Sequence, residues 1–312
     1  MKKIFIEVPT WLGDCVMATP AIENIVKTYP DVKITILGSV VSTAVFEAHP
    51  NVEKIIVDES RDAKIRLLWL YKMAKRLGTF DLALSFRRTS TSKLLIFFMK
   101  AKSKANYSRL TSEVLHQVIR YNDFVNKTLG VETKADTLKV YFDAHHYEKP
   151  TLGINPGASY GSAKRWYPEK FAEVALALST RYDIVLFGGP NEVDIANEIE
   201  EALRKANVSN YNNLAGKTDI KTLCQKIGGL DLFITGDSGP MHVAAALKVP
   251  TVAIFGPTND AETSQWMNPK SVIVKKEMAC APCMKRTCPL GHHECMKFIE
   301  ADDVLTAVKE IT

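Results

Sequence analysis

The sequence predicts two doubly wound α/β domains, each built on a parallel β-sheet. Short runs rich in β-branched residues alternate with longer amphipathic segments, which is the pattern of βαβ units. The alternation stops at a polar segment that ends in Pro150 and then starts again. The chain has 312 residues, enough for two domains if one domain takes roughly 100–200 residues.

The first half is expected to alternate strands with helices. We predict strands over residues 3–8, 33–38, 54–57 and 82–85, and a turn over 10–13. One helix is expected to follow the turn and to end near residue 28. Two more helices are expected over residues 40–49 and about 62–77. The apolar run 94–99 is expected to be a buried strand or the buried face of a helix.

The second half is expected to repeat the pattern, with strands over 153–155, 183–187, 232–235 and 251–255. Residues 143–150 form the linker, which gives an N-terminal domain over 1–146 and a C-terminal domain over 151–312. The last helix is a candidate to pack back on the N-terminal domain. Ligands of open parallel sheets bind outside the carboxyl ends of the strands. We therefore expect the domains to face each other across a cleft, with the chemistry in the loops after the strands.

Composition excludes several classes of protein. Hydrophobic residues make up 46% of the chain and charged residues 24%, which is ordinary for a globular protein. No run approaches the roughly 18 apolar residues of a membrane span. The basic start is followed by an apolar run that stops at Glu7 without a cleavage site, so we expect a cytoplasmic protein. A net charge of +5 is too small to indicate a nucleic-acid partner.

The charge is unevenly distributed along the chain. Residues 1–150 hold 23 Lys and Arg against 16 Asp and Glu, a net charge of +7, and the remainder carries −2. The stretch 82–112 has no acidic residue but contains Arg87, Arg88, Lys93, Lys100, Lys102, Lys104 and Arg109. Such a block predicts an anionic partner or surface, with a solvated basic face as the simpler alternative. For the run 94–99, contact with a membrane surface is the alternative to burial.

Four loops after predicted strands carry candidate functional residues. The first contains Gly13, which permits a tight turn, and Asp14, which suits either a helix N-cap or a general base. The second, 155–166, combines small residues with Lys164 and is a weak phosphate-binding pattern. The third, 234–246, leads from Asp237 into the start of a small-residue helix, where a pyrophosphate can bind. In the fourth, Glu192 is placed to accept from a ribose hydroxyl.

Taken in order, these motifs resemble those of one family. They are Trp11-Leu-Gly-Asp14, Pro156-Gly-Ala with Ala163-Lys-Arg-Trp166, Asn213-Leu-Ala-Gly216, Gly236-Asp-Ser-Gly-Pro-Met-His242 and Phe255-Gly-Pro-Thr258. On these motifs the sequence is identified as a member of glycosyltransferase family 9, the ADP-heptose–lipopolysaccharide heptosyltransferases. Through Trp-Leu-Gly-Asp and Ala-Lys-Arg-Trp it is most similar to heptosyltransferase II.

The resemblance implies a GT-B fold and an inverting transfer of heptose from ADP-heptose to heptosyl-Kdo in the lipopolysaccharide inner core, without an obligatory cofactor. Asp14 matches the proposed general base and Lys164 the lysine on the donor phosphates. The remaining donor-site candidates are Gly13, Ser159, Glu192, Asp237, Ser238, Gly239 and His242. Acceptor-binding candidates are Trp11, Arg87 and Arg88. The acceptor lies at a membrane, which implies a peripheral position at the inner face of the inner membrane.

Four of the six cysteines lie close together, at Cys280, Cys283, Cys288 and Cys295, with His292 and His293 between them. In a cytoplasmic protein such spacing favours metal or redox chemistry over structural disulfides. A structural zinc site is the natural hypothesis, with reduced thiols or adventitious disulfides as alternatives. Cys15 and Cys224 are expected to be buried apolar residues.

Two other functions compete with the leading one. The first keeps the family but changes the acceptor, as in heptosyltransferase I or III. The second belongs to another class, a non-catalytic nucleotide- or metal-binding module whose working part is the cysteine cluster.

Overall fold

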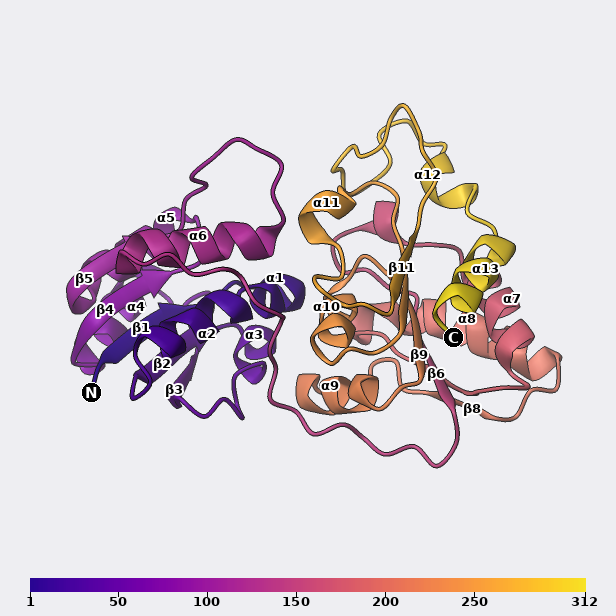
Figure 1. The fold of residues 1–312 in the computed structure, drawn as a ribbon, viewed down its shortest axis with the longest axis horizontal. Coiled ribbons are helices and arrows are strands. Elements are labelled where there is room, and N and C mark those ends of the chain that lie inside the picture. The colour runs from indigo at the N-terminus through magenta and orange to yellow at the C-terminus, as the bar shows by residue number, and fades with distance from the viewer. The chain divides into compact units, whose positions relative to one another are not determined.

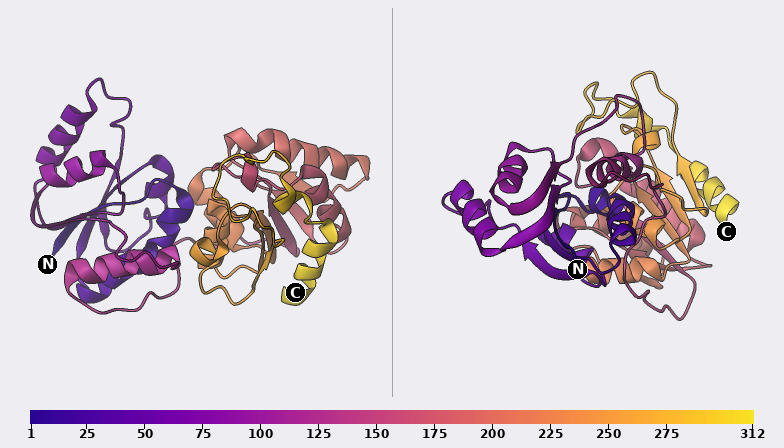
Figure 2. Two further views of the ribbon diagram at one scale, coloured as in Figure 1. Left: turned by 90° about the horizontal axis from the view of Figure 1, so that it is seen from above. Right: turned by 60° about the vertical axis from the view of Figure 1, so that its left-hand side comes forward.

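The chain forms two α/β units, Met1–Tyr141 and Phe142–Thr312, in the computed structural model, which describes residues 1–312 (Figure 1). Each unit holds one parallel sheet with helices on both of its faces (Figure 2). None of the helices combines the length and the apolar character that crossing a membrane requires.

The N-terminal unit has a five-stranded sheet in the order β3-β2-β1-β4-β5, all neighbours parallel. Its strands are β1 (Lys3–Glu7), β2 (Lys33–Gly38), β3 (Val52–Val57), β4 (Thr79–Ser85) and β5 (Lys100–Asn106). Its helices are α1 (Leu12–Met17), α2 (Thr19–Thr28), α3 (Val40–Ala44), α4 (Arg66–Arg76), α5 (Ser90–Phe98) and α6 (Gln117–Leu129). β1 is central because its apolar residues are buried on both faces, as is typical of parallel strands.

The N-terminal sheet is covered by two pairs of helices. α4 and α5 pack together on one face, where Leu70 and Leu95 contact Phe5 and Phe80 of the sheet. α2 and α6 form the second pair. Local signals fix the helix ends: Thr89 caps α5 by accepting from the Ser92 N–H, and α6 ends at Gly130, whose φ of 67° suits glycine.

The C-terminal unit has a six-stranded sheet in the order β11-β10-β9-β6-β7-β8, again parallel. Its strands are β6 (Thr151–Asn155), β7 (Asp183–Leu186), β8 (Tyr211–Asn213), β9 (Leu232–Gly236), β10 (Thr251–Ile254) and β11 (Ser271–Val274). Its helices are η1 (Ser162–Lys164), α7 (Pro168–Leu178), η2 (Pro190–Glu192), α8 (Val193–Lys205), α9 (Ile220–Gly228), α10 (Gly239–Ala246), α11 (Asp260–Thr263), α12 (Glu294–Lys297) and α13 (Ala301–Ile311).

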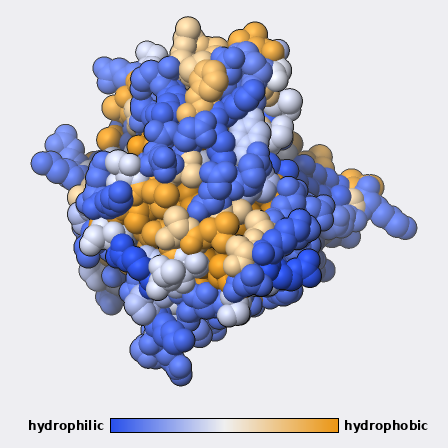
Figure 3. Space-filling model, turned by 90° about the vertical axis from the view of Figure 1, so that its right-hand side faces the viewer, coloured by the Kyte–Doolittle hydropathy of each residue, from blue (hydrophilic) through white to orange (hydrophobic).

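The core of the C-terminal unit joins its last segment to its first strands. Trp166 is fully buried, stacks edge-on against Phe171 and donates its indole N–H to the Ile299 carbonyl at 3.0 Å. α13 packs against α7, β10 and β11 of the same unit. On the face seen in Figure 3, hydrophobic side chains gather in a band across an otherwise hydrophilic surface.

Three local expectations differ most from the structure. The helix expected up to residue 28 is two helices, which meet at Ala18 just before Pro20, a residue without an N–H to donate. The helix expected over 40–49 ends at Ala44. The apolar run 94–99 lies mainly in α5 but is only partly buried, because Leu94 and Phe97 are 42% and 72% exposed.

Candidate active site

The loops after β6, β9 and β10 meet at one edge of the C-terminal sheet. These three strands are neighbours and parallel, so their carboxyl ends lie side by side. The loop after β6 carries Lys164, the loop after β9 carries Asp237, and the loop after β10 carries Thr258. This edge is where open α/β sheets bind their ligands.

Lys164, Asp237 and Thr258 form one buried polar cluster. The Lys164 Nζ lies 2.6 Å from the Asp237 Oδ2 and 3.3 Å from the Asp237 carbonyl oxygen. The Thr258 hydroxyl donates to the same Oδ2 at 2.6 Å. The two charged side chains are only 13% and 5% exposed, so the ion pair is shielded from water. Its partners hold the lysine ammonium in one position at the end of β9.

The helix that follows β9 points its N-terminus at the same edge. α10 begins at Gly239 with Ser238 as its cap residue and Pro240 in its first turn. The Ser238 hydroxyl is fixed by Thr235 at 3.1 Å and by the Asn155 amide at 3.4 Å. The free N–H groups of a helix N-terminus favour an anion, and here they add to the Lys164 charge.

Glu192 is buried beside the start of the loop after β6. Its Oε2 accepts from the Gly189 N–H at 2.8 Å, and its side chain is packed against Gly157. A Cβ at Gly157 would overlap the Glu192 carboxyl group, so a larger residue there would displace that side chain. The carboxylate is thereby held beside Gly157, in the loop after β6 that also carries Lys164.

In the N-terminal unit, Asp14 lies in the first turn of α1. The cap position is occupied by Trp11, which is 50% exposed, so the interpretation of Asp14 as the N-cap is wrong. Burial raises the pKa of the adjacent Cys15 thiol well above its ordinary value, and the Asp14 carboxylate raises it further. The Asp14 carboxylate itself is partly exposed, and it follows the carboxyl end of β1.

Arg87 is an internal residue of the N-terminal unit. Its Nη1 lies 3.3 Å from both the Glu7 and the Asp58 carboxylates, and its Nε donates to the Val8 carbonyl at 2.7 Å. Burial raises the pKa of Glu7, an effect that Arg87 and the hydroxyls of Ser85 and Ser92 oppose. Arg88, by contrast, is exposed. The two arginines therefore have different roles, which their adjacency in the sequence does not reveal.

Comparison with known proteins identifies the family of this chain. Residues 111–294 match the family model for glycosyltransferase family 9 (heptosyltransferase). The lipooligosaccharide heptosyltransferase 2 of Campylobacter jejuni is 43% identical, over 99% of this chain and 98% of that protein. The chain belongs to glycosyltransferase family 9.

Solved structures agree on the fold of this family 9 glycosyltransferase. The Escherichia coli ADP-heptose lipopolysaccharide heptosyltransferase II superposes with a TM-score of 0.81 at 23% identity, covering 99% of this chain and 98% of that one. An E. coli heptosyltransferase (WaaC) determined with ADP gives a TM-score of 0.79 at 15% identity, with 99% and 100% covered. Both Rossmann-like domains of the GT-B fold are thus confirmed.

The structure brings only some of the donor-site candidates of this transferase together. Lys164, Asp237 and Ser238 meet at the strand ends, and Gly239 begins α10, on which His242 is buried. Ser159 is exposed on the loop after β6. Thr258 was missed as a site residue, although its place in the loop after a strand is the signal that marked the others.

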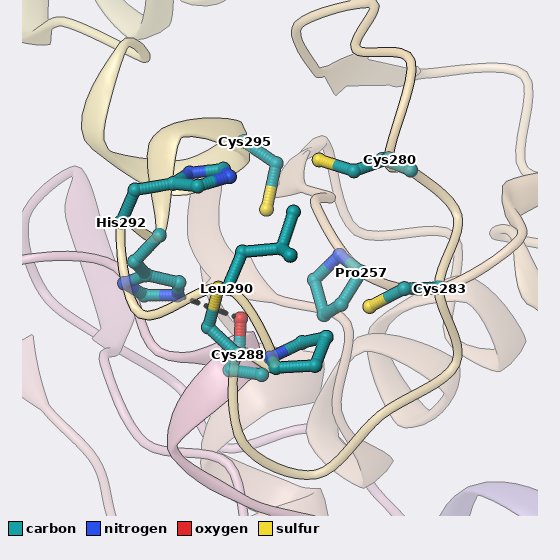
Figure 4. Close-up of a pocket in the computed structure, with 11 residues that line it drawn as sticks. Pro257, Cys280, Cys283, Cys288, Leu290, His292 and Cys295 are labelled. Atoms are coloured by element: carbon teal, nitrogen blue, oxygen red, sulfur yellow. Dashed lines mark hydrogen bonds between the residues drawn. The ribbon is translucent and has the colours of Figure 1, made fainter.

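The zinc hypothesis is not borne out. The structure has no group of three or more His, Cys, Asp or Glu side chains that could hold a metal ion. Cys280, Cys283, Cys288 and Cys295 are free thiols spread around a pocket that Pro257 and Leu290 also line (Figure 4). Burial raises the pKa of Cys295, and the neighbouring thiols raise it further. The four cysteines, which are close in the sequence, do lie around one pocket, but their side chains do not have the geometry of a metal site.

Proposed function

We propose that this transferase moves L-glycero-D-manno-heptose from ADP-heptose to a heptosyl-Kdo acceptor in the inner core of lipopolysaccharide, with inversion at the anomeric carbon. The cluster of Lys164, Asp237 and Thr258 beside the N-terminus of α10 carries this proposal. The 43% identity to a lipooligosaccharide heptosyltransferase 2 supports the choice of donor and acceptor. The donor belongs to the C-terminal unit and the acceptor to the N-terminal unit.

The donor diphosphate becomes the leaving group. As the bond between the anomeric carbon and the phosphate oxygen breaks, negative charge grows on that oxygen. Lys164 and the free N–H groups of α10 stabilise this charge, and they are already in place before the reaction. The Asp237 carboxylate holds the Lys164 ammonium at 2.6 Å, and Glu192 accepts from a ribose hydroxyl. ADP leaves with the electron pair of the broken bond.

Asp14 activates the acceptor. Its carboxylate takes the proton of the acceptor hydroxyl while that oxygen forms the new bond to the anomeric carbon. One displacement of this kind inverts the configuration and needs no covalent enzyme intermediate. A partly exposed carboxylate in the first turn of α1 suits this step. Loss of a general base typically costs about 10²–10⁴-fold in rate.

The acceptor unit also carries features suited to a membrane surface. Leu67, Leu68 and Tyr71 on α4 and Phe97 on α5 are exposed apolar residues on two helices that pack together. Exposed lysines lie beside them, at Lys72, Lys75, Lys93, Lys100 and Lys104. Apolar side chains flanked by cations are typical of elements that bind an anionic membrane face. This combination supports a peripheral position at the inner membrane.

A transfer assay with acceptors truncated at successive core positions tests the function. We expect transfer from ADP-heptose only to an acceptor that already bears one heptose. Transfer to an acceptor with none would make the protein a heptosyltransferase I, and transfer only to a longer core a heptosyltransferase III. In the same assay Asp14→Asn is expected to lose at least about 10²-fold in kcat while keeping its affinity for ADP. Equal binding of ADP, UDP and GDP without any transfer would favour a non-catalytic binding module.

A further inference from the structure

The segment that holds the four cysteines lies across the loop after β6. The Ala163 N–H donates to the Arg286 carbonyl at 3.0 Å, and the Tyr160 hydroxyl donates to the Met284 carbonyl at 3.0 Å. Met284 in turn donates its N–H to Pro257 in the loop after β10 at 2.8 Å. The segment is therefore tied to two of the loops that form the donor site.

Two further features make this contact specific. A Cβ at Gly161 would overlap the Arg286 carbonyl, so the close approach of the two chains requires glycine there. His293 Nε2 lies 2.9 Å from the Ala163 carbonyl and its Nδ1 lies 3.2 Å from the Tyr167 hydroxyl. With the proton on Nε2, both contacts are hydrogen bonds. The backbone at Arg286 is thus fixed relative to Lys164.

The Arg286 side chain reaches the same aromatic ring as Lys164. Its guanidinium carbon lies 5.2 Å from the centroid of the Tyr160 ring, and the Lys164 Nζ lies 4.8 Å from that centroid. Cations at such distances are attracted to the ring. Tyr160 thus contacts two positive groups, from segments far apart in the sequence, beside the cluster of Lys164, Asp237 and Thr258.

The charge of the site explains why a second cation is needed. Asp237 already neutralises Lys164. This ion pair therefore has no net positive charge with which to attract an anionic diphosphate. Arg286 is exposed and is in no ion pair, so its charge is available. Its planar guanidinium can donate two parallel hydrogen bonds to one phosphate.

We propose that Arg286 binds the donor diphosphate, as a second cation beside Lys164. This inference rests on the proposed function, since it assigns a further ligand to the same site. It makes the segment over residues 280–295 a wall of that site and gives Tyr160 the role of placing Arg286. It also gives the enzyme a means to distinguish a nucleoside diphosphate from a monophosphate.

Titration calorimetry with ADP and AMP on four proteins tests the proposal. The proteins are the wild type, Arg286→Met, Arg286→Lys and Lys285→Met, the last being an exposed cation on the same segment. Loss of charge-assisted hydrogen bonds to phosphate predicts that Arg286→Met binds ADP about 10–100-fold more weakly, with a smaller loss for AMP. Arg286→Lys should recover part of the affinity, and Lys285→Met should match the wild type.

A second variant moves Arg286 without removing its charge. Gly161→Ala inserts a Cβ where the Arg286 carbonyl lies, so it should weaken ADP binding although every cation remains. Near-UV circular dichroism checks that the variants keep their fold. If Arg286→Met binds ADP within about 3-fold of the wild type, or if Lys285→Met loses as much, the proposal is wrong. Failure of the wild type to prefer ADP over UDP and GDP would instead overturn the proposed function.

Discussion

Arg87 and Arg88 are neighbours in the sequence but have different surroundings in the fold. Arg87 bridges Glu7 and Asp58 inside the N-terminal unit, whereas Arg88 faces the solvent. Both were expected to bind the acceptor, and both lie in the acid-free stretch 82–112. The structure leaves only Arg88 with a free surface for an anionic ligand. We therefore keep Arg88 in the proposed acceptor site and treat Arg87 as a residue that holds the ends of β1, β3 and β4 together.

A pair of variants tests this difference. Arg87→Met leaves the Glu7 and Asp58 carboxylates buried without their cation, which should lower the free energy of unfolding by about 3–5 kcal/mol. The loss should grow as pH rises, because burial raises the pKa of Glu7 and the folded variant then holds a proton that the unfolded chain releases. Urea unfolding measures both effects. Arg88→Met is the control, and a similar loss there would contradict the assignment.

Cysteine reactivity provides a second test at single residues. The backbone N–H of His293, with those of residues 290–292, lowers the pKa of the Cys288 thiol. Burial raises the pKa of Cys224 to about 12. Because the thiolate is the reactive form, Cys288 should be alkylated at a lower pH than Cys224 in the folded protein. Mass spectrometry after brief treatment with iodoacetamide measures both sites. Preferential labelling of Cys224 below pH 8 would contradict this prediction.

At the scale of elements, the apolar run 94–99 has a role that periodicity could not decide. In α5, Leu95 and Ile96 face the sheet, whereas Leu94 and Phe97 are exposed beside α4. Lys104 of the neighbouring strand donates to the Phe97 carbonyl at 2.7 Å, so a cation is fixed next to the exposed ring. The expected burial is therefore confirmed for one face of the helix only, and contact of the exposed face with a membrane stays a prediction.

Vesicle binding measures what the exposed face does. The double variant Lys100→Glu and Lys104→Glu should lose most of its binding to vesicles with anionic phosphatidylglycerol, because each basic residue near such a surface contributes about 1 kcal/mol. Phe97→Ser should weaken binding to the same vesicles without changing the charge. ADP affinity should remain that of the wild type in both variants. Equal sedimentation of all three proteins with the vesicles would show that this face is ordinary surface.

At the scale of the whole molecule, the division of labour between the two units can be measured directly. Apart from Gly13, every residue assigned here to the donor belongs to Phe142–Thr312. Hydrogen exchange with and without ADP should therefore show added protection in residues 155–166, 236–246 and 284–288. The strands β1–β5 should be protected equally in both conditions. Protection centred on the N-terminal sheet would place the nucleotide in the wrong unit.

The sequence by itself determined the fold class, the approximate positions of eight of the eleven strands and the loops that carry the site, whereas β5, β8 and β11 were missed. These follow from local causes: β-branched runs form strands, glycine and proline end them, and parallel strands bring their following loops to one edge. The bounds of helices were less predictable, because tertiary packing decides how far an amphipathic segment stays helical. The early end of α3 at Ala44 is an example.

Only the tertiary structure decided which charges find partners. Thr258 and Asp237 meet on one oxygen, Arg286 reaches the ring that Lys164 also contacts, and Arg87 is neutralised inside its unit. The four cysteines share a pocket but lack the arrangement of a metal site. The physical reason is the same in each case. Electrostatic and coordination chemistry depend on distances of a few ångströms between segments remote in the sequence, and those distances are set by how whole strands and helices pack.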